Sequence, residues 1–149
     1  ALTRLCHAIG NMMAVQGGGQ ILNVSSIAAF QPGPWLSTYF ASKAYVLHFS
    51  EGLREEVKKT GIKVSVLCPG ITRTGFFDAA KMNTDAIKQN ARALSPEEVA
   101  LYTVRALDKN KAIIIPGRRN RWLTRLPRVF SRWMTRKIAA SVNKSYCPR

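Results

Sequence analysis

The spacing of hydrophobic and polar residues along the chain changes between a helical period and short apolar runs. Apolar side chains recur every three or four positions in residues 1–16, which predicts an amphipathic helix. Short apolar runs bounded by Gly or Pro predict strands at residues 21–26, 62–68 and 112–115. Strands that alternate with helices are typical of parallel βαβ units, so the pattern favours an α/β fold.

Two further helices are predicted between these strands. The first begins with Ser37 or Thr38 as its cap and runs to about Thr60, where Gly61 ends it. Its apolar stripe, which we expect to pack on the sheet, consists of Val46, Phe49, Leu53 and Val57.

The second of these helices has a strong start signal. Ser95 is a favourable N-cap, Pro96 suits the first helical position, and Glu98 completes a capping box. We therefore predict a helix over 95–108, preceded by a loop with short helical pieces over 71–94.

The predicted architecture is a doubly wound parallel sheet of about three strands with flanking helices. A sheet this narrow would leave an apolar edge uncovered, which natural proteins avoid. The chain also begins inside a predicted helix, with no strand before it. We therefore expect this chain to form part of a larger α/β domain.

The positive charge of the chain lies mostly at one end. The 149 residues have a formal net charge of +15 at pH 7. Residues 118–149 contain ten Lys or Arg residues and no acid, whereas residues 1–117 contain 13 basic residues and all 8 acids. We therefore divide the chain into a body, residues 1–117, and a basic C-terminal segment, residues 118–149.

Composition excludes several classes of protein. A hydrophobic content of 46% argues against a disordered tail, and no run approaches the roughly 18 apolar residues of a membrane span. Cys6, Cys68 and Cys147 lie far apart without a CxxC pair, so we predict neither a disulfide framework nor a metal site. With no signal peptide recognisable at the start, we expect a reducing, cytoplasmic location.

Tyr39 and Lys43 form a YxxxK pair at the start of the predicted long helix. Four residues separate them, so they share one helix face one turn apart. A lysine ammonium beside a phenol stabilises the phenolate, which would suit Tyr39 as a general acid/base. Tyr and Lys are also common on helix surfaces, so the spacing alone favours a solvated helix face over a catalytic pair.

Other polar and turn residues are predicted to meet this pair. Ser26 lies 13 residues before Tyr39, at the carboxyl end of the first predicted strand. Pro69-Gly70 ends the next strand and is followed by Ile71 and Thr74. In open α/β sheets ligands bind outside the carboxyl ends of the strands, so we expect these segments to line one crevice.

With these motifs the sequence resembles the short-chain dehydrogenase/reductase family. The matching pieces, in the order and separation of the family, are Asn23-Val24-Ser25-Ser26, Tyr39-Phe40-Ala41-Ser42-Lys43 and Pro69-Gly70-Ile71-Thr72-Arg73-Thr74. The resemblance covers residues 1 to about 117. It implies the C-terminal portion of a Rossmann-like dehydrogenase domain, with the basic C-terminal segment following it.

The resemblance implies an NAD(P)-dependent oxidoreductase that interconverts a secondary alcohol and a ketone. Ser26 would hydrogen-bond the substrate oxygen, Tyr39 would exchange a proton with it, and Lys43 would assist Tyr39 and bind the nicotinamide ribose. Ser42 belongs to the motif without an assigned role. The implied catalytic residues are Ser26, Tyr39 and Lys43, and the implied cofactor-binding residues are Tyr39, Lys43, Pro69, Gly70, Ile71 and Thr74.

The family's main cofactor-binding motif is missing from the chain. Gly17-Gly18-Gly19 follows a predicted helix and precedes a strand, whereas a phosphate cradle needs the opposite order. The residue that selects NAD or NADP is missing too, so the choice stays open. We expect an incomplete domain, in which this chain alone is an inactive fragment, and an apolar substrate pocket near Phe76, Phe77, Ala79 and Met82.

The basic C-terminal segment is predicted to form an amphipathic helix that starts or kinks at Pro127. Its arginines recur every three or four residues, and Trp122 and Trp133 occupy other faces. Attachment to an anionic membrane surface fits this pattern, and so does packing on the body or on a partner with solvated arginines. Nucleic-acid binding fits the charge but no reading motif.

Two function classes other than a dehydrogenase fit parts of the sequence less well. A Ser-His-Asp hydrolase lacks the GxSxG elbow, and His7 and His48 are expected to take part in helix packing rather than catalysis. A non-catalytic module that uses the basic C-terminal segment to bind membranes or proteins is the main alternative to the enzyme. The resemblance also implies a homodimer or homotetramer through the helix over 38–60.

Overall fold

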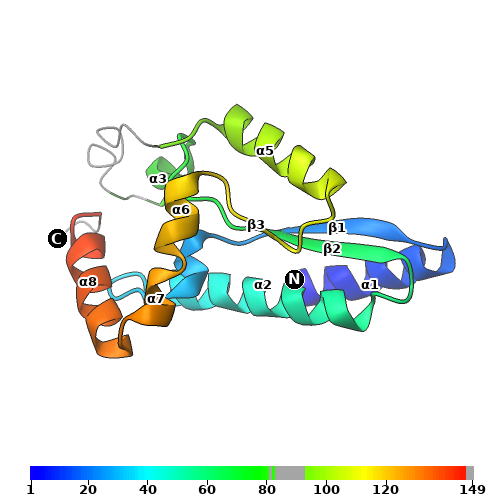
Figure 1. The fold of residues 1–149 in the computed structure, drawn as a ribbon, viewed down its shortest axis with the longest axis horizontal. Coiled ribbons are helices and arrows are strands. Elements are labelled where there is room, and N and C mark those ends of the chain that lie inside the picture. The colour runs from blue at the N-terminus through cyan, green and yellow to red at the C-terminus, as the bar shows by residue number, and fades with distance from the viewer. Residues whose placement is uncertain (81, 83–92, 147–149) are drawn as a thin grey trace.

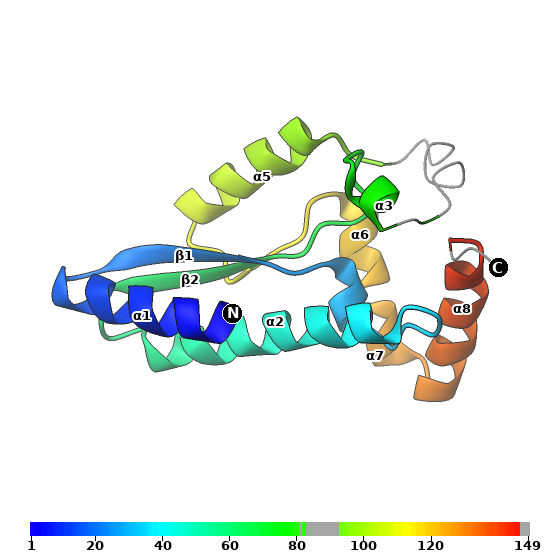
Figure 2. The same cartoon turned by 180° about the vertical axis from the view of Figure 1, so that it is seen from behind.

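A three-stranded parallel sheet with helices on both faces forms the centre of the molecule (Figures 1 and 2). The structure is a computed structural model that describes residues 1–80, 82 and 93–146. The strands β1 (Gly19–Val24), β2 (Ile62–Leu67) and β3 (Ile113–Ile114) lie in the order β1-β2-β3. The predicted α/β fold with parallel strands is confirmed.

The sheet is covered by α1 (Leu2–Val15) and α2 (Ser37–Glu56) on one face and by α5 (Pro96–Asp108) on the other (Figure 1). Because both faces of β2 are covered, five of its six residues are buried, and only Lys63 is exposed. On the α2 side, Leu47 packs with Val66 and Cys68. The opposite core cluster consists of Leu67, Val99, Ala106 and Ile114.

The close approach of two turns explains part of the glycine run before β1. Gly18 and Gly61 both have positive φ, and a Cβ added at Gly18 would lie 2.8 Å from the Gly61 carbonyl oxygen. Gly19 pairs with Ile62, so β1 begins and ends two residues earlier than predicted. The third strand is shorter than predicted and consists of Ile113–Ile114.

The long helix differs from its prediction at both ends. It begins at Ser37 after Leu36, which makes no side-chain cap, and it ends at Glu56 rather than near Thr60. Residues 57–60 form turns before β2. Neither proposed cap residue is used as a cap.

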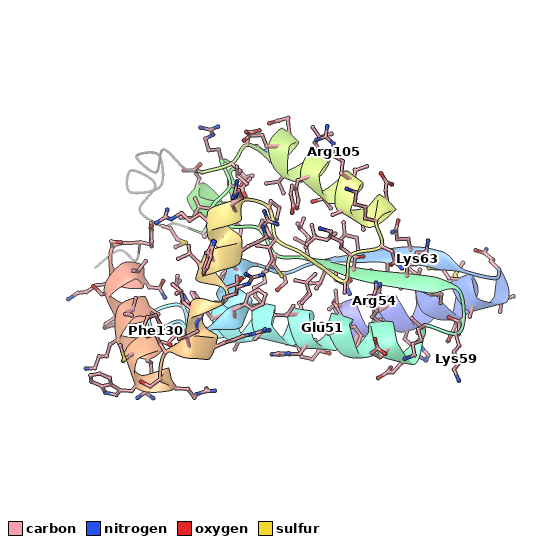
Figure 3. The ribbon with its side chains drawn as sticks, viewed as in Figure 1. Glu51, Arg54, Lys59, Lys63, Arg105 and Phe130 are labelled. Carbon is pink, nitrogen blue, oxygen red and sulfur yellow. The ribbon has the colours of Figure 1, made fainter. Side chains whose placement is uncertain are left out.

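The buried face of α2 is also not the predicted stripe. Phe40, Leu47 and Ser50 are its buried residues, whereas the four predicted stripe residues are only half-buried. The buried face is partly polar because Ser50 accepts a hydrogen bond from Asn23 Nδ2 (2.9 Å). Arg54, on the same face, donates to the Val64 carbonyl and to Asn110 (Figure 3). Because these contacts with the sheet and with the residue Asn110 before β3 are polar, a search for apolar spacing does not identify this face of α2.

The start of α5 and the described part of the loop before it agree with their predictions. Ser95 caps α5, with the Ser95 Oγ accepting from Glu98 N–H (3.2 Å) and the Glu98 carboxylate accepting from Ser95 N–H (2.7 Å). The preceding connection contains the short helix α3 (Phe76–Ala79). Residues 81 and 83–92 of the predicted loop lie outside the described residues.

Within its described residues, 118–146, the basic C-terminal segment folds as three helices, and the prediction of a single helix is wrong. They are α6 (Arg118–Leu123), α7 (Leu126–Val129) and α8 (Arg132–Lys144). Extended backbone at Phe130 separates the last two, and Ser131 caps α8 by accepting from Met134 N–H (3.3 Å). Pro127 lies in the first turn of α7, where its missing N–H is tolerated. No helix in the described part of the chain is long and apolar enough to cross a bilayer.

Candidate active site

The exits of β1 and β2 are joined directly by hydrogen bonds. The 3₁₀ helix η1 (Ile27–Phe30) begins after β1, and Ser26 caps it by accepting from Ala28 N–H (3.1 Å). The backbone N–H of Ile27, the residue after Ser26, donates to the Pro69 carbonyl (3.0 Å). The Ser26 segment and the Pro69-Gly70 turn therefore lie side by side, as the sequence predicts.

Two hydrogen bonds connect the start of α2 to the end of β1. Ser25 Oγ donates to the Lys43 carbonyl (2.7 Å), and Lys43 Nζ donates to the Val24 carbonyl (3.2 Å). The second bond directs the ammonium group toward the sheet end, where it lies 5.9 Å from the centre of the Tyr39 ring. The helix pair and the strand exit thus form one connected unit.

Aromatic contacts hold the Tyr39 ring. The edge of Phe40 lies against it, with ring centres 6.0 Å apart and nearly perpendicular planes. Phe76, from α3, contacts it with ring centres 5.9 Å apart. The segment after β2 therefore reaches back over the start of α2 and brings an apolar side chain to the tyrosine.

One cavity of about 1500 Å³ connects these elements. Its wall offers hydroxyl, phenol, ammonium and guanidinium groups among mainly apolar side chains, the positively charged ones being Lys43, Arg118 and Arg119. A carbonyl or alcohol oxygen placed beside Ser26, Tyr39 and Lys43 would meet proton donors and a positive charge, and much of the rest of a ligand would meet apolar side chains. All the predicted site residues line this cavity: Ser26, Tyr39, Lys43, Pro69, Gly70, Ile71 and Thr74.

Asn120 is a lining residue that the sequence analysis missed. Its Nδ2 donates to the Pro116 carbonyl (2.7 Å) in the turn after β3. A Cβ added at Gly70 would lie 2.6 Å from this amide, so the glycine allows α6 to approach the turn after β2. The signal in the sequence was Pro116-Gly117, which ends the third strand at the same edge of the sheet.

The basic C-terminal segment contributes a wall of the same cavity. Periodicity alone cannot tell what a helix face packs against, so the sequence did not predict this contribution to the site. The boundary at residue 117 remains a prediction. The large apolar side chains that the segment adds to the wall are Leu123, Leu126, Phe130, Ile138 and Val142.

Two other candidate groups lie apart from this chemistry. Cys68, the residue after β2, is fully buried. Burial raises the pKa of its thiol to about 12, and a hydrogen bond with Ser25 opposes this rise more weakly. Cys68 packs as a small buried hydrophobic side chain. His48 is exposed, and its Nδ1 lies 3.9 Å from Glu51. Within the described residues no three His, Cys, Asp or Glu side chains are grouped to hold a metal ion.

The chain matches a known family model and several known proteins. A model described as short chain dehydrogenase matches residues 1–85. The probable oxidoreductase EphD of Mycobacterium tuberculosis is 34% identical over 123 residues, covering 72% of this chain and 21% of the relative. Dehydrogenase/reductase SDR family member 4 of Bos taurus is 38% identical over 106 residues, covering 67% of this chain and 38% of the relative.

A solved structure shares the fold. A short-chain dehydrogenase from Sphingobium yanoikuyae, determined in complex with NADPH, superposes with a TM-score of 0.72 and 30% sequence identity. The match covers 81% of this chain and 47% of that one. The chain therefore spans less than half the length of these similar proteins.

Proposed function

The chain belongs to the short-chain dehydrogenase family, and on this basis we propose that the protein carrying it is an NAD(P)-dependent oxidoreductase that interconverts a secondary alcohol and a ketone. One observation carries the proposal. Ser26, Tyr39 and Lys43, which come from two different elements, line one cavity at the carboxyl ends of the strands. This is where open α/β sheets bind their ligands.

The residues present fit the nicotinamide and ribose end of the cofactor. When bound, the nicotinamide supplies or accepts the hydride. Lys43 Nζ is positioned by the Val24 carbonyl to donate a further hydrogen bond to a ribose hydroxyl. Ile71 and Thr74, beyond the Pro69-Gly70 turn, would contact the carboxamide. The described residues contain no glycine-rich turn from a strand into a helix, so we assign them no pyrophosphate contact.

Proton transfer follows from the hydrogen bonds at the site. Ser26 Oγ already accepts from Ala28 N–H, so its own proton is available for the substrate oxygen. Tyr39 would pass its proton to that oxygen during reduction and take it back during oxidation. The Lys43 ammonium, 5.9 Å from the ring centre, places a positive charge beside the site of this proton exchange.

Substitution of Tyr39 tests this function in the full protein. We expect Tyr39→Phe to lower kcat/KM by about 10²-fold to 10⁴-fold, the usual contribution of a positioned acid/base. The assay follows nicotinamide absorbance with secondary alcohols and ketones. Tyr45→Phe is the matched control, because Tyr45 lies on the same helix, is 52% exposed and is hydrogen-bonded to Thr3. Retained activity in Tyr39→Phe would disprove the assignment.

A non-catalytic binding module is the alternative function. It predicts that the full protein binds no nicotinamide cofactor, whereas the oxidoreductase predicts saturable quenching of tryptophan fluorescence by NADH or NADPH. The same titration, carried out on this chain alone, tests whether it binds the cofactor without the rest of the protein.

We also propose that the protein forms a homodimer or homotetramer through the outer faces of α1 and α2. Large apolar side chains are exposed there, including Leu5 (60%) and Met12 (62%) on α1. Light scattering during size-exclusion chromatography measures the mass in solution, and Met12→Glu is expected to shift it to that of the monomer. A monomeric mass for the unsubstituted protein would contradict this proposal.

A further inference from the structure

All three tryptophans of the chain are exposed and lie on segments at one end of the molecule. Trp35, Trp122 and Trp133 are 65%, 67% and 60% exposed. Trp35 lies in the loop between η1 and α2, which α8 holds through a hydrogen bond from Asn143 Nδ2 to the Pro34 carbonyl (3.0 Å). Figures 1 and 2 both place this loop beside α8, with α6 and α7 at the same end.

This end, which we call the tryptophan end, also carries unbalanced positive charge. The last acidic residue of the chain is Asp108, and ten basic residues follow from Arg118 onward. Both salt bridges found among the described residues lie on α2 or just after it, so none involves α6, α7 or α8. Arginines and lysines gathered without acids repel one another, and an anionic surface would relieve this repulsion.

Two cation–indole pairs lie in this region, one at the junction of α6 and α7 and one on α8. The Arg125 guanidinium lies 6.0 Å from the centre of the Trp122 ring, and Lys137 Nζ lies 5.9 Å from that of Trp133. Each pair presents a positive charge beside a large amphipathic ring. Tryptophan concentrates at membrane–water interfaces, where the ring meets the lipid boundary and the cation meets phosphate.

Aliphatic side chains accompany the tryptophans. Val129 on α7 is 81% exposed and Met134 on α8 is 40% exposed, and neither lines the cavity of the candidate active site. Exposed aliphatic side chains neither stack on bases nor bind phosphate, so they would contribute little to binding a nucleic acid. They gain from the apolar boundary beneath lipid headgroups. Their presence favours a bilayer over a soluble polyanion.

We infer that the tryptophan end docks on the surface of an anionic lipid bilayer. Basic side chains of α6, α7 and α8 contact the headgroups, while Trp35, Trp122, Trp133 and Val129 enter the interface. The opposite end of the molecule, where Figure 3 shows Lys59 and Lys63, does not share this unbalanced charge, since Lys58 beside Lys59 is paired with Glu55. Docking is independent of the proposed oxidoreductase activity.

Co-sedimentation with vesicles tests the docking without substrate or cofactor. The full protein is mixed with vesicles of phosphatidylcholine alone or of phosphatidylcholine with phosphatidylglycerol. We expect binding only to the anionic vesicles, with an affinity that falls as salt rises. Equal binding to both vesicles, or to neither, would overturn the inference.

Paired variants test which end is responsible. Arg128→Gln with Arg132→Gln should weaken partitioning by about 30-fold, since each basic residue near an anionic surface contributes roughly fivefold. The matched control, Lys59→Gln with Lys63→Gln, removes the same charge at the opposite end and should change it by less than about twofold. If the control pair weakens binding as much as the arginine pair, binding reflects net charge and no docking surface exists.

A third pair separates the bilayer from a soluble polyanion. Trp122→Ala with Trp133→Ala keeps the charge and should weaken vesicle binding while leaving heparin binding within about twofold. Unchanged vesicle binding in this pair would disprove insertion of the rings. Far-ultraviolet circular dichroism of each variant confirms that α6, α7 and α8 remain helical.

Discussion

The buried hydrogen bond between Asn23 and Ser50 fixes α2 against β1, and Ser50→Ala removes it. Asn23 Nδ2 donates to Ser50 Oγ at 2.9 Å, and Ser50 Oγ donates to the Val46 carbonyl at 2.7 Å. Because β1 leads into Ser26 and α2 carries Tyr39, this contact helps to set the distance between two proposed catalytic side chains.

The expected cost follows from the burial of the amide. Asn23 is 5% exposed and Ser50 is 2% exposed. Cys6 Sγ donates to Asn23 Oδ1 at 3.6 Å, so the amide is held on its other side and cannot turn freely to a new acceptor. Leaving a buried donor unpaired costs about 1–3 kcal/mol. We expect Ser50→Ala to lower the free energy of unfolding by about 2 kcal/mol, because losing one oxygen adds little cavity volume.

Urea denaturation followed by circular dichroism measures this change. Ser145→Ala is the matched control, since Ser145 Oγ makes a similar bond to the Val142 carbonyl (2.7 Å) at an exposed position, and its cost should stay within about 0.5 kcal/mol. A double-mutant cycle with Asn23→Ala should give a coupling energy of about 1 kcal/mol or more. If Ser50→Ala costs no more than the control, the bridge does not stabilise the fold as argued.

Two further predictions concern packing and pH. Gly33→Ala should lower the free energy of unfolding by about 1–3 kcal/mol, because a Cβ there would overlap the buried Phe40 ring. Gly52→Ala should raise it by about 0.5–1 kcal/mol, because Gly52 lies on α2 with open space around it. Urea denaturation measures both changes. Stability should fall as pH rises above 9, because burial raises the pKa of Cys68 to about 12 and the unfolded thiol loses its proton first. Cys68→Ala should remove about 1.4 kcal/mol per pH unit of this slope; parallel pH curves for the two proteins would contradict the argument.

Local signals made part of the fold predictable from the sequence. The capping box at Ser95 determines where α5 begins, since all its partners lie within four residues. The meeting of the segments that follow β1 and β2 was predictable, because parallel strands have their carboxyl ends at the same edge of the sheet. Ser26, Tyr39 and Gly70 therefore reach one cavity, as their order along the chain predicts.

Features that depend on distant partners were not predictable in this way. The buried face of α2 contains Ser50 and Arg54, whose partners come from the strands and from Asn110, so a search for apolar periodicity selected a neighbouring face. Asn120 reaches the site because Gly70 leaves room for it, which is a matter of packing. Which side of α8 faces the body could not be predicted, because it depends on where the helix packs, and it packs on the loop at Pro34.

The two walls of the cavity come from stretches of sequence that are far apart. The proposed proton-transfer groups belong to residues 26–43, whereas much of the apolar wall comes from residues 123–142. Mutations in residues 123–142 can therefore reshape what the cavity accepts and leave the Tyr39–Lys43 arrangement unchanged. Selection for a new substrate, in nature or in a directed-evolution library, could act on this stretch alone, and exchanging it between relatives could transfer a substrate preference.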